Sequence, residues 1–252
     1  KAASAKNKAL VESGEEPTET EIKPIVGCEF YVVENRHKRQ FTKDDRDKRY
    51  YQLLLAKNAK GYQNLVKLCS LGYIEGLYGK YPRIDKELIL QYHEGLIATT
   101  CCIGAEVPQT ILKKGEEAGE KEFKWWLDLF TRENGEVDYY IEIQRHGMAE
   151  QEKVNQILLK WAIKYNVKVI ASNDSHYIDQ KDANAHDILL CINTGEKQAT
   201  EKMKDFDEDV SSKGKRFAFY NDQFYFKNTQ EMSSIFKDIP QAIDNTQEIL
   251  GK

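Results

Sequence analysis

Apolar residues recur along this chain in two alternating patterns. Short runs rich in β-branched and aromatic residues predict buried strands, and longer runs with apolar residues three or four positions apart predict helices. The clearest helix is expected where Val154, Leu158 and Trp161 share one face and charged residues occupy the other. Strands are expected over 23–33, 50–56, 96–102, 137–144, 167–172 and 217–227, and helices over 58–74, 106–115, 117–132, 148–166 and 182–192.

The alternation of strands and helices sets the expected fold class. Strands joined by helices of this length pair in parallel through right-handed crossovers. We therefore predict an α/β fold built on a parallel sheet. Periodicity by itself does not decide whether such a sheet closes into a barrel.

Three polar segments and two short helices complete the pattern. Residues 1–22 indicate a helix end followed by a surface loop, and residues 193–216 indicate a polar connector. The charge-dense segment 34–49 could contact phosphates, but its acidic residues offset the basic ones, and we predict a solvated loop. Thr229 is expected to cap the first C-terminal helix, and Pro240 is expected in the first turn of the second.

Composition narrows the class of protein only slightly. The formal net charge of −4 does not mark the whole chain as a polyanion binder. No apolar run approaches the roughly 18 residues that a membrane span needs, and no signal peptide precedes the first predicted strand. The chain has five cysteines, an odd number without a CxxC pair. This usage fits a reducing compartment, and we expect a cytoplasmic protein without a membrane partner.

Residues suited to acid–base or metal chemistry collect at the predicted strand ends. Asp174 and His176 follow the strand at 167–172, and on an extended backbone their spacing directs both side chains to the same side. The carboxyl ends of parallel strands meet at one edge, where α/β proteins usually build their sites. We therefore expect these side chains to lie around one opening at that edge of the sheet. Comparable groups lie on three other predicted strands: Glu29, Cys101, Cys102, Glu142 and His146.

These residues allow two interpretations. Mixed His, carboxylate and Cys donors suit zinc, while carboxylate with imidazole also suits manganese or iron. A metal there could activate water and polarise a phosphoryl oxygen. Each residue also has an ordinary structural explanation: Asp174 as a turn residue, the cysteines as small core residues, and His186 as a surface partner of Asp182 on one helix face.

Six segments of the chain occur in an order that is typical of one protein family: IKPIVGCEFYV, YYQLLLAKNAKGYQNLVKL, LIATTCCIGAEVP, YYIEIQRHG, IASNDSHYIDQKDANAHDILLCI and NDQFYFK. They resemble the PHP (polymerase and histidinol phosphatase) domain of bacterial DNA polymerase III alpha subunits. The resemblance runs from about Ile22 to the C-terminus. It implies a distorted (β/α)7 barrel with a metal cleft at the carboxyl ends of its strands. Because the family's first strands are absent, the barrel is expected to be incomplete and open.

The resemblance also implies a set of metal ligands. The family pattern matches Glu29, Cys102, His146, Asp174 and His176. The family's opening His-x-His strand and its Asp-His-Gly segment do not occur, and Tyr51 stands where the family often has His. Zinc or manganese is therefore expected in the cleft of a parent protein rather than in this chain. Alone, the chain is expected to be catalytically inactive.

The same resemblance predicts how the chain is divided and what it meets. It implies a polar segment at 1–22, a PHP barrel core at 23–205, and a segment at 206–252 that leads toward a polymerase palm. The palm carboxylates, with the Mg²⁺ they use, belong to later domains that do not occur in this sequence. The implied partners are the remaining domains of the alpha subunit, other replisome subunits such as a proofreading exonuclease, and DNA through the parent chain.

Three classes of function follow. The first is a polymerase fragment whose PHP domain is a scaffold, with a vestigial site or a metal-dependent 3′–5′ exonuclease site. The second is a free-standing PHP phosphoesterase that acts on a small phosphate ester. The third is a non-catalytic module that binds another replisome subunit. The C-terminal segment IPQAIDNTQEILGK resembles the family's bridge into the palm, which argues against the second class.

Overall fold

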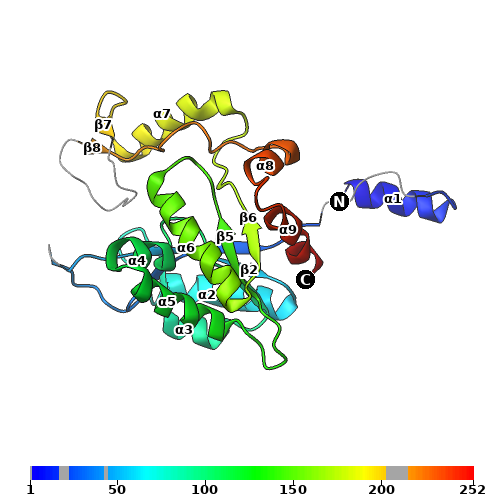
Figure 1. The fold of residues 1–252 in the computed structure, drawn as a ribbon, viewed down its shortest axis with the longest axis horizontal. Coiled ribbons are helices and arrows are strands. Elements are labelled where there is room, and N and C mark those ends of the chain that lie inside the picture. Colours follow the sequence, from blue (N-terminus) through cyan, green and yellow to red (C-terminus); the bar gives the residue numbers. More distant parts are fainter. Residues whose placement is uncertain (1, 17–22, 43–44, 203–214) are drawn as a thin grey trace.

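A six-stranded sheet forms the centre of the structure (Figure 1). It is described from a computed structural model, which describes residues 2–16, 23–42, 45–202 and 215–252. Among the described strands, the first and last in spatial order are free edges, so the sheet is open. The predicted α/β fold with an incomplete, open barrel is confirmed. The strands in spatial order are β3 (Arg83–Asp85), β1 (Gly27–Val33), β2 (Tyr50–Ala56), β4 (Leu96–Thr99), β5 (Tyr139–Ile143) and β6 (Val169–Ala171).

One strand of the sheet runs against the others. β1 pairs in parallel with β3, and β4, β5 and β6 pair in parallel in turn, whereas β2 is antiparallel to both β1 and β4. The parallel pairing expected of the sheet is therefore wrong for β2. The described residues between β1 and β2 form no helix, and a crossover helix is what a parallel neighbour would need. As a result, the start of β2 lies beside the carboxyl ends of its neighbours.

Helices cover the sheet and join its strands (Figure 1). α2 (Ala59–Ile74) packs against β2, α6 (Ala149–Tyr165) against β5, and α9 (Gln241–Gly251) against β6. In the described parts of the chain, no helix is long and apolar enough to cross a membrane. The other helices are α1 (Ala2–Glu12), α3 (Lys86–Tyr92), α4 (Glu106–Lys114), α5 (Glu116–Leu129), the short 3₁₀ helix η1 (Gln180–Asp182), α7 (Ala183–Thr194) and α8 (Thr229–Ile235).

Alternation along β1 and β2 sorts their side chains between the two faces of the sheet. Phe30 and Val32 of β1 and Leu54 of β2 are buried in the main hydrophobic core with residues of the helices. Glu29 and Tyr31 point to the opposite face, because successive side chains on a strand alternate. That second face carries the candidate site.

Helix starts differ from the predictions in detail. Residues 75–95 contain β3 and α3, which the sequence pattern did not predict, and the Asp85 side chain caps α3. α8 is capped by Asn228 rather than Thr229, and Pro240 lies just before α9 rather than inside its first turn. Both corrections move a helix start by one residue, the usual uncertainty of helix ends.

The strand predicted at 217–227 is wrong. Residues 217–224 form no strand, and Tyr225 makes only an isolated bridge with Tyr177. The alternating aromatic residues that suggested a strand are used for packing instead. Phe219 and Phe224 contact each other edge to face, with ring centroids 4.5 Å apart. Such ring contacts contribute stability without a hydrogen-bonded ladder.

The charged segment 34–49 is less solvated than predicted. Arg36 is only 6% exposed. Its guanidinium lies 2.8 Å from carboxylate oxygens of both Asp85 and Glu75, and 2.9 Å from one of Glu87. A guanidinium can be buried when carboxylates from elsewhere in the chain satisfy its donors. These acidic residues lie outside the segment, so its local charge balance could not reveal the burial.

Two expectations fall partly outside the described residues. The surface loop predicted within 1–22 includes 17–22, and the polar connector at 193–216 includes 203–214, where the predicted domain boundary also lies. The described front of the first segment is helix α1, as expected of its helix end. Short strands β7 (Glu201–Lys202) and β8 (Lys215–Arg216) pair in parallel on either side of 203–214.

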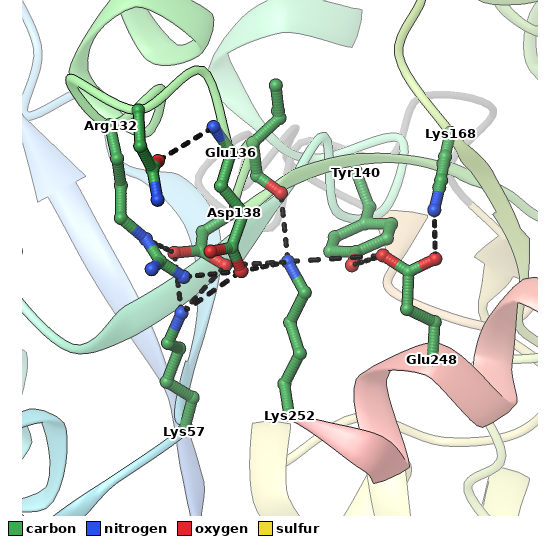
Figure 2. Close-up of polar contacts among 10 residues, drawn as sticks. Lys57, Arg132, Glu136, Asp138, Tyr140, Lys168, Glu248 and Lys252 are labelled. Atoms are coloured by element: carbon green, nitrogen blue, oxygen red, sulfur yellow. Dashed lines mark hydrogen bonds and ion pairs between the residues drawn. The ribbon is translucent and has the colours of Figure 1, made fainter.

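An ion network at the amino end of β5 ties α9 to the sheet (Figure 2). Asp138, just before β5, accepts hydrogen bonds from Lys57 Nζ at 3.0 Å and Arg132 Nε at 2.8 Å. Lys252, at the end of α9, donates to Asp138 at 2.7 Å. Three cations thus converge on one buried carboxylate. The network also includes Glu136, Tyr140, Lys168 and Glu248.

Candidate functional site

Six of the residues named from the sequence line a single cleft of about 300 Å³. The cleft lies beyond the carboxyl ends of β4, β5 and β6, whereas Glu29 and Tyr31 reach it from the middle of β1. β2 runs in the opposite direction, so Tyr51 reaches the same place from the start of its strand, paired with Tyr31 of β1. The predicted residues that line the cleft are Glu29, Tyr51, Cys102, His146, Asp174 and His176.

Asp174 and His176 contact each other at the cleft. Asp174 Oδ1 lies 3.3 Å from His176 Nε2, and the side chains are 35% and 38% exposed. The extended backbone expected here is wrong for Asp174, whose φ of 49° is left-handed. Such a conformation is uncommon outside glycine but is tolerated by Asp and Asn. The two side chains meet because the backbone turns, and His176 N–H donates to Phe224 O at 2.8 Å.

His146 is buried, and both of its ring nitrogens are engaged. Its Nε2 lies 2.8 Å from the carbonyl oxygen of Asn173, and its Nδ1 lies 3.1 Å from the amide nitrogen of Gln151. An amide N–H can only donate, so Nδ1 accepts and Nε2 carries the proton given to the carbonyl. Burial lowers the pKa of His146, which favours this neutral form. The lone pair that could bind a metal is therefore already used.

Tyr51 fills the space between β1 and the loop after β4. Its ring centroid lies 5.4 Å from that of Tyr31. On its other side the ring lies so close to Gly104 that a Cβ there would come within 2.6 Å of Tyr51 Cδ2. Cys102 Sγ is 3.7 Å from the same Cβ position. A bulky phenol thus occupies the place where the resemblance predicts a smaller imidazole.

Two strand-end candidates lie outside the cleft. Cys101 is 6% exposed, and its hydrogen bond with Cys102 together with burial raises the pKa of its thiol well above the ordinary value. Glu142 is 7% exposed and accepts hydrogen bonds from Thr99 Oγ1 at 2.7 Å and Gln144 Nε2 at 3.2 Å. Both side chains are held within the protein between strands. These contacts support a structural role for Cys101 and Glu142.

The cleft as arranged does not fit a zinc or manganese ion. Among the described residues, no three or more His, Cys, Asp and Glu side chains are grouped closely enough to hold a metal. Protein metal sites of this type use at least three such ligands. Asp174 and His176 contact each other, while His146 is held by Gln151 and the Asn173 carbonyl. The ligand role of these residues remains a prediction of the family resemblance.

Several residues of the cleft were not predicted from sequence. Phe224 stacks on His146 with ring centroids 4.0 Å apart, and Phe219 lies 4.4 Å from the His176 ring. Gln151, in the first turn of α6, sets the orientation of His146. The aromatic run at 217–227 was the one visible signal, and it suggested a strand. Nothing local indicates which rings will lie against which histidines.

A family model of the PHP domain matches residues 2–146. This covers more than half of the 252 residues. The chain belongs to the PHP domain family. The cleft described above takes residues from inside this match, such as Glu29 and Cys102, and from beyond it, such as Asp174 and His176. Tyr51 and the hydrogen-bonded His146 are features of this PHP domain's own cleft.

Relatives of this PHP domain include proteins named DNA polymerase III subunit alpha. The DNA polymerase III subunit alpha of Borreliella burgdorferi is 39% identical over 92% of this chain and 18% of that protein. That of Deinococcus radiodurans is 41% identical over 84% of this chain and 15% of that protein. The DNA polymerase III subunit alpha of Thermus aquaticus is 39% identical over 95% of this chain and 18% of that protein. The resemblance to this family is confirmed, and the chain spans less than a fifth of each of these relatives.

Proposed function

We propose that this chain takes part in DNA replication as the PHP portion of a bacterial DNA polymerase III alpha subunit. The similarity to three such subunits over 84–95% of the chain is the observation that supports this most. In such a parent, template-directed DNA synthesis and its Mg²⁺ belong to other domains. Cytoplasmic location, contact with DNA through the parent, and contact with the remaining alpha domains and other replisome subunits are parts of the same proposal.

Within that parent, we propose a scaffold role with an impaired metal site. The engaged nitrogens of His146 and the bulk of Tyr51 support this role. Both features favour a cleft that is stable without an ion. Phe224, stacked on His146, serves the same end because it buries that imidazole against apolar surface.

The alternative is a metal-dependent 3′–5′ exonuclease. The Asp174–His176 pair, 3.3 Å apart at the cleft, favours it. Glu29, Cys102 and His146 would complete the ligand set, and a bound zinc or manganese ion would activate water against a phosphodiester. In this chain the alternative requires His146 to exchange its hydrogen bond from Gln151 for a metal.

Metal analysis separates the two roles. A parent protein that contains this chain is dialysed against zinc and then manganese, and bound metal is measured together with nuclease activity on a mismatched primer end. His176→Ala tests the cleft, and His93→Ala, which removes a ring in edge-to-face contact with Phe130 away from the cleft, is the matched control. We expect no stoichiometric metal in any of the three proteins. Stoichiometric metal that is lost only in His176→Ala would overturn the scaffold role and establish the alternative.

The size of the native gene product tests the polymerase assignment separately. A parent chain several-fold longer than 252 residues is expected, because the relatives are covered to only 15–18%. A native product of about this length would contradict the assignment to a polymerase and favour a free-standing phosphoesterase.

A further inference from the structure

Two cysteine side chains meet on the face of the sheet opposite the cleft. Cys28 of β1 shares a face with Phe30 and Val32, because alternate residues of a strand point the same way. Cys69 belongs to α2, and both cysteines pack against the main hydrophobic core. Their Sγ atoms are 3.7 Å apart, although 41 positions separate them in the chain. Both are free cysteines, so the fold brings two thiols into direct contact.

The surroundings of the pair do not suit a metal ion. Among the described residues, no third His, Cys, Asp or Glu joins the two cysteines in a group that could hold a metal. The Cys28 thiol donates to the carbonyl oxygen of Glu29 at 3.6 Å, and the Cys69 thiol donates to Cys28 Sγ. Thiols are weak donors, so these hydrogen bonds hold the side chains only loosely. The two sulfurs can therefore react with each other.

The separation of the sulfurs is close to that of a covalent bond. A disulfide bond is about 2.05 Å long, so the sulfurs would have to move roughly 1.7 Å closer. Rotation of the two side chains supplies movements of this size. Both cysteines are half-buried, so a small oxidant can reach them. On α2, Cys69 lies toward the side of the exposed Val66 and Tyr73, which are three and four positions away.

We propose that Cys28 and Cys69 form a reversible disulfide when the protein meets glutathione disulfide. The Cys69 thiolate attacks one sulfur of glutathione disulfide, which joins Cys69 to one glutathione and releases the other as its thiolate. Cys28 Sγ then loses its proton, attacks Cys69 Sγ and releases the second glutathione. Two protein thiols are oxidised, and one glutathione disulfide is reduced to two thiols.

The surroundings of Cys28 make it the second of the two attackers. Burial, and after it the neighbouring Cys69, raise the pKa of Cys28 to about 12, and a thiol that keeps its proton is a poor nucleophile. The contribution of Cys69 ends once glutathione occupies its sulfur. The short distance between the sulfurs then favours attack by Cys28 over a second glutathione from solution.

The disulfide would join β1 to α2. Because β1 also brings Glu29 and Tyr31 to the cleft, oxidation would fix one wall of the cleft to a helix on the other face of the sheet. A bond between residues 41 positions apart also restricts the unfolded chain, so the oxidised form should resist unfolding. Disulfides of a reducing compartment are usually transient, as in redox sensing. This redox pair does not depend on the proposed role in replication.

Mass spectrometry of the native protein that contains this chain tests the pair. The protein is equilibrated with mixtures of glutathione and glutathione disulfide, and the remaining thiols are trapped with N-ethylmaleimide. Trypsin should release peptides 9–36 and 68–80, each with one cysteine, because the bond between Lys23 and Pro24 resists cleavage. We expect the two peptides to become joined as the share of glutathione disulfide rises, and to separate again in excess glutathione.

Variants show which sulfurs are needed. Cys69→Ser should lose the joined peptides completely. Cys191→Ser, at a buried cysteine of α7, is the matched control and should form them as wild type does.

Three results would overturn the proposal. The two peptides carry glutathione but never join each other, the joined peptides do not separate in excess glutathione, or they form as readily in concentrated urea as in buffer. The last result would mean that the fold does not bring the two thiols together. All three are measured on the wild-type protein, so they decide the matter even if Cys69→Ser does not fold.

Discussion

Replacing Asp138 with Asn should destabilise the chain by removing the anion at the centre of the ion network (Figure 2). The Asp138 side chain is 7% exposed, and those of Lys57 and Lys252 are 13% and 12% exposed. Asn keeps the shape but not the charge. The two ammonium groups would then remain largely desolvated beside a neutral amide.

The expected loss is about 3 kcal/mol, the lower end of the roughly 3–5 kcal/mol that breaking a buried ion pair costs. Two features limit it. Arg132 is 39% exposed and keeps Glu136 at 2.6 Å, so it can turn to water or to that partner. Lys252 keeps a hydrogen bond to the Val137 carbonyl at 2.9 Å. Most of the remaining loss in the free energy of unfolding comes from Lys57 and from the weakened attachment of α9 to the sheet.

Urea unfolding followed by circular dichroism measures this loss. With a slope of about 3 kcal/mol per M, the Asp138→Asn midpoint should fall by about 1 M. Asp238→Asn is the matched control, because Asp238 also pairs with an arginine but its side chain is 56% exposed. The control should lose less than about 1 kcal/mol. Equal midpoints for wild type and Asp138→Asn would refute the reasoning and mean that desolvation of the network cancels its attraction.

Three further predictions concern stability. Gly61→Ala should lower the free energy of unfolding by about 3 kcal/mol, because the new Cβ would lie 1.9 Å from the carbonyl oxygen of Gly95, and an unchanged thermal midpoint would contradict it. The hydrogen bond from Arg145 lowers the pKa of Asp238 to about 2, so this pair should stabilise the fold above about pH 4 and lose that effect as the pH falls to about 2. The urea midpoints of wild type and Asp238→Asn should therefore differ above about pH 4 and become equal as the pH falls to about 2. Trp161→Ala should cost about 3–5 kcal/mol by leaving a cavity, since Trp161 is fully buried, and calorimetry that shows less than about 1 kcal/mol would refute it.

The sequence predicted the members of the cleft better than their contacts. Asp174 and His176 could be predicted to lie together because they are two residues apart. Their actual contact uses a left-handed backbone at Asp174 that no pattern indicated. The state of His146 depends on Gln151 and on the carbonyl of Asn173, and the latter is 27 residues away. Hydrogen-bond partners at such a separation leave no local periodicity to detect.

The same limit applies to the fold. The helix at 148–166 was predicted nearly to its ends, because one apolar face repeats over several turns. β3 has only three residues and α3 only seven, too few for a period to emerge. The aromatic run at 217–227 has the alternation of a strand, yet its rings pack on histidines of the cleft. Alternating apolar residues show that one side of a segment is buried. They do not show whether that segment is a hydrogen-bonded strand or an irregular loop packed on the core.

Hydrophobic periodicity and turn residues act over a few positions, so they were enough to predict the α/β class, the order of most elements and most of the residues that line the cleft. The direction of β2, which brings Tyr51 into the cleft, and the hydrogen bonds that occupy both nitrogens of His146 depend on the folded structure. The burial of Arg36 depends on it as well. These features arise from contacts between residues far apart in the chain, where packing and desolvation outweigh local preference.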